Sequence, residues 1–192
     1  MVFIWASVTG GVFSGKTNAL MNIVDRIRSE SQINLCGFIQ PSYYYNDERE
    51  GYNLLILSKN DILIEKFAMV NYAAKPGIIP YNFNNEGFIN TEKEANSYEF
   101  DGKPVLCIID EFGQLEAIFN KGHYNAVCKW IERLKEYDNA IIVLSYHERR
   151  KAISDEFMMK FGVKKADFQL NLPASDEDIN EFYSCINNTL IH

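Results

Sequence analysis

Gly10-Gly11-Val12-Phe13-Ser14-Gly15-Lys16-Thr17 fits the pattern G-x-x-x-x-G-K-(S/T) of a phosphate-binding loop. The apolar run of residues 2–8 precedes it, and a stretch with helical spacing of apolar residues follows it. Such a loop binds anions when a buried strand delivers it to a helix N-terminus, where free backbone N–H groups and the helix dipole face the ligand. The sequence therefore predicts a strand, a loop and a helix that bind the phosphates of a nucleoside triphosphate.

The residue types in this loop have separate physical roles. Gly10 and Gly15 permit turn geometry and close approach of the backbone to phosphate. Lys16 is predicted to reach the β- and γ-phosphates as a catalytic residue, and Thr17 is predicted to offer its hydroxyl to Mg²⁺. The predicted nucleotide-binding residues are Gly10, Gly11, Val12, Phe13, Ser14, Gly15, Lys16, Thr17 and Asn18.

The composition favours one compact domain spanning residues 1–192, because 47% of the residues are apolar. The net charge of −7 favours a mononucleotide over a nucleic acid as the partner. No apolar run approaches membrane-spanning length, and the apolar start of the chain lacks the basic segment of a signal peptide. The cysteines form no C-x-x-C pair, so we expect neither disulfides nor zinc. A cytoplasmic protein without a membrane or nucleic-acid partner is expected.

The first half of the chain contains a predicted antiparallel insert at about residues 40–85. Two strand-like pieces flank the polar, Gly-ended turn of residues 46–51, which is typical of a β-hairpin. Pro76 and Gly77 separate the last two strand-like pieces. The strands expected after the first helix are residues 33–39, 43–45, 52–57, 62–67 and 78–83.

The second half alternates strands with helices, which implies an α/β fold with a mainly parallel sheet and helices on both faces. Ser175 and Asp178 resemble a capping box that opens the last helix. The expected strands are residues 105–109, 140–144 and 166–172, and the expected helices are residues 90–98, 124–137, 151–161 and 177–187.

A second candidate site segment is the apolar strand of residues 105–109, which ends in Asp110 and Glu111. Ligands of open α/β sheets lie outside the carboxyl ends of the strands, so Asp110 is expected beside the loop, holding Mg²⁺ through water. A carboxylate directly after this aspartate can polarise an attacking water, which makes Glu111 the predicted general base for hydrolysis.

A catalytic Glu111 also predicts that an extra strand, residues 140–145, lies between the loop strand and the strand that ends at Asp110. Ser145 or His147 then becomes a candidate sensor of the γ-phosphate, although His147 suits a structural role equally well. Arg149 and Arg150 are candidates for an arginine finger supplied in cis, or for a solvated surface.

With both motifs placed, the chain resembles the small nucleoside-triphosphatase family whose vertebrate members are called cancer-related nucleoside-triphosphatases. The resemblance rests on the loop and on five further segments: residues 36–41, residues 49–52, residues 81–88, the acidic block of residues 110–116 and an apolar strand that ends near His147. It implies a RecA-like P-loop fold, Mg²⁺, and slow hydrolysis of several nucleoside triphosphates to the diphosphate and phosphate. Within the family pattern, Lys16 and Thr17 match the phosphate and Mg²⁺ positions, Asp110 the metal-organising aspartate and Glu111 the catalytic glutamate. Glu116 matches a second acid of that block.

The loop departs from this family where Val12, Phe13 and Asn18 replace smaller or hydroxyl residues, and Gln114-Leu115 departs in the acidic block. If Phe13 needs a positive φ, its side chain costs on the order of 1 kcal/mol. Two alternatives to hydrolysis therefore stay open: a nucleotide-binding regulatory module with little turnover, and a small-molecule or nucleotide kinase whose acceptor is framed by the tyrosines of the insert. No N-K-x-D run is present, so low base specificity is expected.

Overall fold

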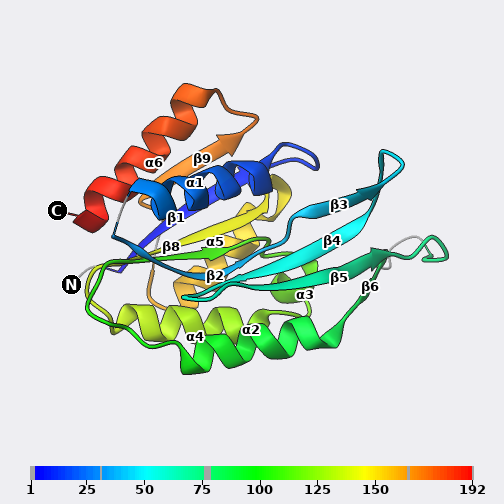
Figure 1. Ribbon diagram of the computed structural model, residues 1–192, viewed down its shortest axis with the longest axis horizontal. Helices are drawn as coiled ribbons and strands as arrows, with labels where there is room; N and C mark the ends of the chain where they lie inside the picture. Colours follow the sequence, from blue (N-terminus) through cyan, green and yellow to red (C-terminus); the bar gives the residue numbers. More distant parts are fainter. Residues whose placement is uncertain (1–2, 31, 76–78, 164, 192) are drawn as a thin grey trace.

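The computed structural model describes residues 3–30, 32–75, 79–163 and 165–191, and the described strands form one nine-stranded sheet (Figure 1). The strand order is β6-β5-β4-β2-β7-β8-β1-β9, and β3 pairs with β4 outside this path. The strands are β1 (Ile4–Gly10), β2 (Asn34–Ile39), β3 (Ser42–Tyr45), β4 (Glu48–Leu57), β5 (Ile62–Val70), β6 (Tyr81–Phe83), β7 (Val105–Ile109), β8 (Ala140–His147) and β9 (Phe168–Leu172).

The half of the sheet that carries the loop is parallel. The strands β2, β7, β8, β1 and β9 run side by side in one direction, and β1 pairs with β8 from Ile4 opposite Ile141 to Gly10 opposite His147. The strand β8 thus lies between β1 and β7, which confirms the extra strand expected from a catalytic Glu111. All residues of β7 are buried, as its uninterrupted apolar sequence requires.

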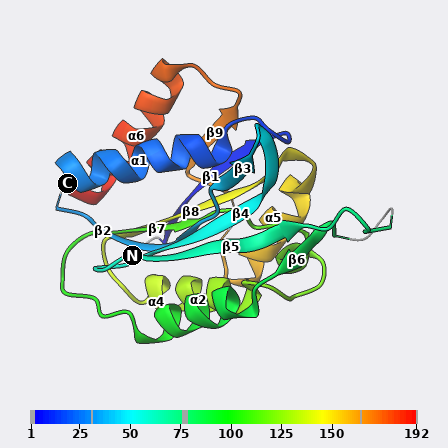
Figure 2. The same cartoon turned by 45° about the vertical axis from the view of Figure 1, so that its right-hand side comes forward.

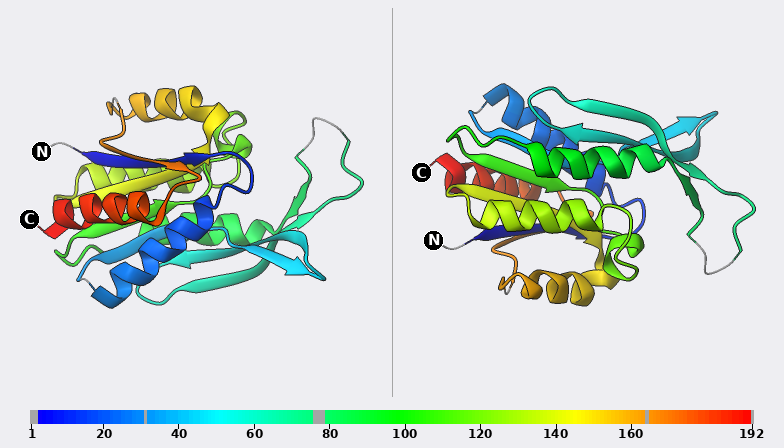
Figure 3. Two further views of the ribbon diagram at one scale, coloured as in Figure 1. Left: turned by 90° about the horizontal axis from the view of Figure 1, so that it is seen from above. Right: turned by 90° about the horizontal axis from the view of Figure 1, so that it is seen from below.

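The other half of the sheet is antiparallel and confirms the predicted insert. The strand β4 pairs antiparallel with β2, and β3, β5 and β6 extend the sheet from it. The far ends of β3, β4 and β5 project past the helical layers on the side of the loop, as the turned views show (Figures 2 and 3). The predicted break at Pro76 and Gly77, and the start of the predicted strand at residue 78, lie outside the described residues.

Helices cover both faces of the sheet, as predicted. Alternate residues of β7 enter two separate cores, because successive side chains of a strand point to opposite faces. One core holds α1 and α6, and the other holds α2, α4 and α5 (Figure 1). The helices are α1 (Lys16–Glu30), α2 (Asn85–Ser97), α3 (Gln114–Ala117), α4 (Tyr124–Lys135), α5 (Lys151–Lys160) and α6 (Asp176–Ile191), with the 3-10 turn η1 (Glu148–Arg150) before α5.

The helices α4 and α5 end at Lys135 and Lys160, within two residues of the prediction, and three other helices differ more. The helix α2 begins at Asn85 rather than at residue 90, because the Asn84 side chain accepts a hydrogen bond from the Glu86 N–H at 3.0 Å and caps it. The short helix α3 was not predicted. The helix α6 runs longer than expected, but its capping box is present: Ser175 Oγ accepts from the Asp178 N–H at 3.2 Å, and Asp178 Oδ2 accepts from the Ser175 N–H at 2.9 Å.

Among the described residues, no helix combines the length and apolar character needed to cross a membrane.

The backbone of Gly37 offers a test of how closely β2 and β7 must approach. Gly37 has φ +93° and an added Cβ would lie 2.0 Å from the Ile108 carbonyl oxygen, whereas Gly102 has φ +87° with open space around it. We expect Gly37→Ala to lower the free energy of unfolding by more than about 3 kcal/mol. Gly102→Ala carries only the left-handed strain of about 1–2 kcal/mol, and urea unfolding of the two variants measures the difference. Equal losses would contradict a steric limit at Gly37.

Candidate functional site

The loop between β1 and α1 has the backbone geometry that its glycines predict. Gly15 has φ +91°, and a Cβ on Gly10 would lie 2.7 Å from the Leu172 carbonyl oxygen. Lys16 opens α1 and is buried, and its Nζ donates to the Gly11 carbonyl at 3.0 Å and to the Gly10 carbonyl at 3.4 Å. The lysine side chain is therefore folded back along the loop.

Phe13 adopts the positive φ that the sequence analysis identified as costly for a bulky side chain. Its φ is +61°, and its side chain is 76% exposed. The left-handed backbone costs a residue with a Cβ about 1–2 kcal/mol. The guanidinium carbon of Arg49, from β4, lies 4.5 Å from the centre of the Phe13 ring, and this cation–π contact offsets about 0.5–1 kcal/mol of that cost.

Asp110 follows β7 and lies directly against the first turn of α1. Its Oδ2 accepts hydrogen bonds from Thr17 Oγ1 at 2.9 Å and from the Gln40 N–H at 3.3 Å, and its Oδ1 accepts from Ser145 Oγ at 2.5 Å. Burial raises the pKa of Asp110, and the hydrogen bonds from Ser145, Thr17 and Gln40 lower it. Ser145, predicted as a possible sensor of phosphate, therefore holds the aspartate.

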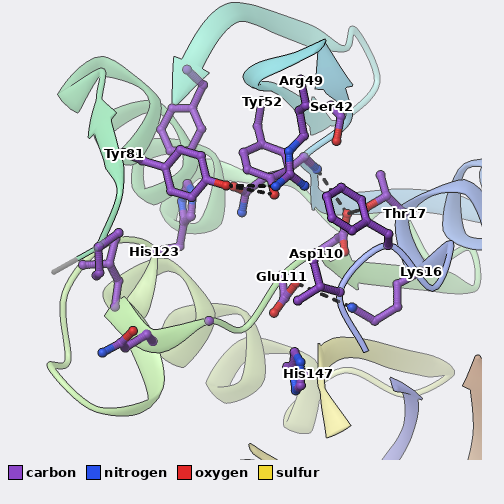
Figure 4. Close-up of a pocket in the computed structure, with 18 of the residues that line it drawn as sticks. Lys16, Thr17, Ser42, Arg49, Tyr52, Tyr81, Asp110, Glu111, His123 and His147 are labelled. Carbon is purple, nitrogen blue, oxygen red and sulfur yellow. Dashed lines mark hydrogen bonds and ion pairs between the residues drawn. The ribbon is translucent and has the colours of Figure 1, made fainter. Parts of the chain in front are cut away.

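Glu111 lies between two cations. Its Oε2 is 3.8 Å from Lys16 Nζ (Figure 4). Its Oε1 is 3.9 Å from Arg150 Nη1. Burial raises the pKa of Glu111, Lys16 and Arg150 lower it, and Asp110 raises it. A carboxylate with a raised pKa is suited to take a proton from water.

The residues at the end of β8 and just after it separate into two groups. His147 and Arg150 line the same cavity as Lys16 and Glu111, whereas Arg149 is exposed and is not among the lining residues. The Nδ1 of His147 accepts from the Arg149 N–H at 3.1 Å. Burial lowers the pKa of His147, and so do Lys16 and Arg150, so this imidazole is favoured in its neutral form.

Sequence reasoning missed several residues of this cavity, which has a volume of 660 Å³. Glu116 is buried, and its carboxylate accepts from the Gly113 N–H at 3.1 Å and from the His123 N–H at 2.9 Å. These bonds fix the segment that follows Glu111. The cavity is also lined by residues to which the sequence assigned no role, among them Gln40, Arg49, Tyr81, Phe88 and His123. Four of them lie in segments that carry the family resemblance, but only the fold shows that they line one cavity.

Comparisons with known proteins identify the family and the fold. The model of the NTPase family matches residues 6–171. The chain belongs to the NTPase family. It is a hydrolase that acts on nucleoside triphosphates, and its fold is similar to the solution structure of a human cancer-related nucleoside triphosphatase, with a TM-score of 0.63 and 16% identity over 100% of this chain and 98% of that chain. No curated protein matches the sequence significantly.

The NTPase has an oxygen-donor set suited to Mg²⁺. The Thr17 hydroxyl and the Asp110 carboxylate lie 2.9 Å apart at the start of α1. Mg²⁺ prefers oxygen ligands and is commonly bound by one or two carboxylates together with substrate phosphates and water. The two side chains therefore fit one side of a hydrated Mg²⁺ ion.

Glu116 provides a test of the support beneath the site. In Glu116→Gln the amide group can accept only one of the two N–H bonds and turns a donor toward the other. We expect the free energy of unfolding to fall by about 1–3 kcal/mol, as measured by urea unfolding. The exposed Glu99→Gln is the matched control and should stay within about 0.5 kcal/mol of the original protein. An unchanged stability of Glu116→Gln would remove this structural role.

Proposed function

We propose that the NTPase catalyses Mg²⁺-dependent hydrolysis of nucleoside triphosphates with low base specificity, and that Glu111 is its general base. The observation that carries this proposal is the position of the Glu111 carboxylate, 3.8 Å from Lys16 Nζ and adjacent in sequence to the Asp110 that binds Thr17. Phosphate-binding, metal-binding and water-activating groups therefore meet at the carboxyl ends of β1 and β7.

In this proposal the loop from Gly10 to Asn18 binds the phosphates through its backbone N–H groups. Thr17 and Asp110 would hold Mg²⁺, which neutralises charge on the phosphates when bound. Glu111 takes a proton from water as the water oxygen attacks the γ-phosphorus. The bond from that phosphorus to the β,γ-bridging oxygen breaks, and the diphosphate carries away the electron pair while Lys16 stabilises the developing charge.

The ion pair between Lys16 and Glu111 supports a change that accompanies substrate binding. In the structure Lys16 Nζ is also bonded to the Gly11 carbonyl at 3.0 Å. An incoming phosphate attracts the lysine more strongly than a neutral carbonyl does, because hydrogen bonds between two charged groups are the stronger kind. Lys16 then moves toward the substrate, and Glu111 becomes free to bind water. Arg150 is proposed to hold Glu111 in place, and His147 to contact the γ-phosphate.

A nucleotide-binding module with little turnover is the second candidate, and Phe13 favours it. The positive φ of +61° places a bulky side chain at a point of the loop where the resembled family has a small one. Strain of about 1–2 kcal/mol is enough to weaken nucleotide affinity or to misplace the phosphates. This candidate differs from the first in the expected rate of phosphate release and not in binding.

We also propose that residues 1–192 form a single domain, that the protein works in the cytoplasm, and that it has no nucleic-acid partner. The single sheet formed by the described strands supports the first point. The net charge of −7 supports the last, because phosphate backbones are bound by basic surfaces.

Glu111→Gln tests the general base. The amide keeps the size of the side chain but cannot accept a proton, so we expect phosphate release to fall by about 100-fold or more. Calorimetry should show nucleotide affinity within about threefold of the original protein, because the loop is unchanged.

The exposed Glu132→Gln serves as the control and should leave both quantities unchanged. Unchanged phosphate release in Glu111→Gln would remove Glu111 from the role of base. Negligible release by the original protein, with binding intact, would favour the module with little turnover.

Removal of Mg²⁺ tests the metal and the breadth of substrates together. With a chelator present, phosphate release from every nucleoside triphosphate should fall to the rate without protein, because the phosphate charge is no longer neutralised. With Mg²⁺ restored, release from ATP, GTP, CTP, UTP and their deoxy forms should differ by less than about tenfold, which corresponds to 1.4 kcal/mol. A strong preference for one base, or activity without any divalent metal, would contradict these parts of the proposal.

A further inference from the structure

The cavity continues well past Glu111, away from the phosphate-binding loop. Lys16 and Thr17 lie on one side of Asp110 and Glu111, and His123 lies on the other (Figure 4). The far part is bounded by β4, β5, β6, α2 and the segment before α4, through Tyr52, Phe67, Tyr81, Phe83, Phe88 and His123. The proposed hydrolysis uses only the near part, where the phosphates and the attacking water bind. The far part of the cavity is therefore left without a role in that reaction.

The direction of the reaction indicates what this far part does not hold. In phosphoryl transfer the attacking and leaving oxygens lie roughly in line through the γ-phosphorus. If Glu111 activates the attacking water, it lies on the side opposite the leaving diphosphate. The sugar and the base extend from that diphosphate, away from Glu111. The pocket beyond Glu111 is therefore not the base pocket of the nucleotide that is hydrolysed, and this step rests on the proposed function.

Aromatic rings form a continuous wall in this far pocket. The rings of Tyr52 and Tyr81 are 5.3 Å apart, Phe83 and Phe88 are 5.5 Å apart, and Phe88 and His123 are 4.7 Å apart. The first four of these side chains are only half-buried, unlike core residues. Aromatic faces left open beside a catalytic group are suited to pack against a flat ring of a ligand.

Arg49 places a positive charge at the mouth of this pocket. Its guanidinium carbon lies 4.5 Å from the Phe13 ring centre and 5.1 Å from that of Tyr52, and its Nη2 donates to Tyr81 Oη at 3.3 Å. No salt bridge of Arg49 is found among the described residues. A guanidinium has five N–H donors and matches carboxylate or phosphate geometry, so this group is ready to bind an anion.

His123 contributes an unpaired acceptor at the far end. The Thr91 hydroxyl lies 2.8 Å from His123 Nδ1, and its single proton also has the Phe88 carbonyl at 2.9 Å and the Gly87 carbonyl at 3.2 Å within reach. When the hydroxyl donates to one of these carbonyls, it accepts from Nδ1–H, and the ring proton lies on Nδ1. The other nitrogen, Nε2, then carries a lone pair and has no hydrogen-bond partner among the described residues. Burial lowers the pKa of His123 to about 3, so the ring stays neutral.

We propose that the pocket beyond Glu111 is a second small-molecule site, which binds a flat heteroaromatic ring that carries an anionic group, as in a nucleoside monophosphate. The ring packs against Tyr81, Phe83 and Phe88 and donates an N–H to His123 Nε2. The anionic group binds Arg49, away from the Glu111 carboxylate. The ligand thus lies next to the γ-phosphate of a nucleotide bound at the loop.

Calorimetry with the loop already filled tests this site. The protein is saturated with Mg²⁺ and a non-hydrolysable β,γ-methylene analogue of ATP, and AMP, GMP, CMP and UMP are then titrated as probes. We expect at least one probe to bind with a stoichiometry of one. Its affinity should fall by tenfold or more in Arg49→Gln and in Phe83→Ala. The matched control Arg28→Gln, which removes a surface arginine paired with Asp61, should leave the affinity within twofold.

The failures of the two proposals are distinguishable. If the analogue itself does not bind to the original protein, the proposed function fails. If the analogue binds but no probe binds, or if a probe only displaces the analogue, the second site is overturned. Probe binding that is unchanged in Arg49→Gln and Phe83→Ala overturns it as well. Thermal unfolding and analogue affinity of each variant report whether it is folded, and Arg49→Lys, which keeps the charge but not the planar donors, should lose part of the probe affinity.

Discussion

The hydrogen bond from Thr17 to Asp110 joins two segments that are distant in the sequence, and the site depends on it. Thr17 belongs to the first turn of α1, and Asp110 follows β7, with β8 lying between β7 and β1. Because the strands are parallel, their carboxyl ends meet at one edge of the sheet. Ser145 at the end of β8 donates to the same carboxylate from between them. One aspartate thereby ties the ends of three structural elements together.

The charged side chains buried around this aspartate each need hydrogen-bonding partners at the right positions. Asp110, Lys16 and Glu116 are each less than 10% exposed, and an unpaired buried charge is costly. Each has at least two hydrogen-bonding partners, several of them backbone groups fixed by the strands and by α3. Glu111 is the exception, since its two ion-pair distances are long, at 3.8 Å and 3.9 Å. The group with the loosest contacts is the one that the proposed reaction requires to exchange partners.

The sequence was most informative where local pattern and chemistry coincide. The loop, the apolar strand before Asp110 and the hairpin insert each have a short signature, so the fold and its central residues could be predicted. The start of α2 at Asn85 was not predicted, because the cap formed by Asn84 is a single side-chain bond inside a polar segment. The kinase alternative anticipated an acceptor site framed by tyrosines of the insert, and Tyr44 and Tyr52 do line the cavity, but the rest of the far pocket was not predicted. Its wall combines β4, β5, β6 and α2 with His123, and only the antiparallel pairing of the insert brings those residues together.

Phe13 connects this insert to the phosphate-binding loop. A glycine in its place would adopt φ +61° without strain, but it would contact nothing on β4. The phenylalanine carries strain of about 1–2 kcal/mol, and the cation–π contact with Arg49 offsets about 0.5–1 kcal/mol of it. The loop conformation is therefore held by its own backbone and not selected by Phe13. What the Phe13 side chain adds is a contact between the loop and the insert, because Arg49 lies against Phe13, Tyr52 and Tyr81 together. A ligand in the proposed far site that drew Arg49 toward it would weaken the contact of Arg49 with Phe13, so the two proposed sites would be coupled through this arginine.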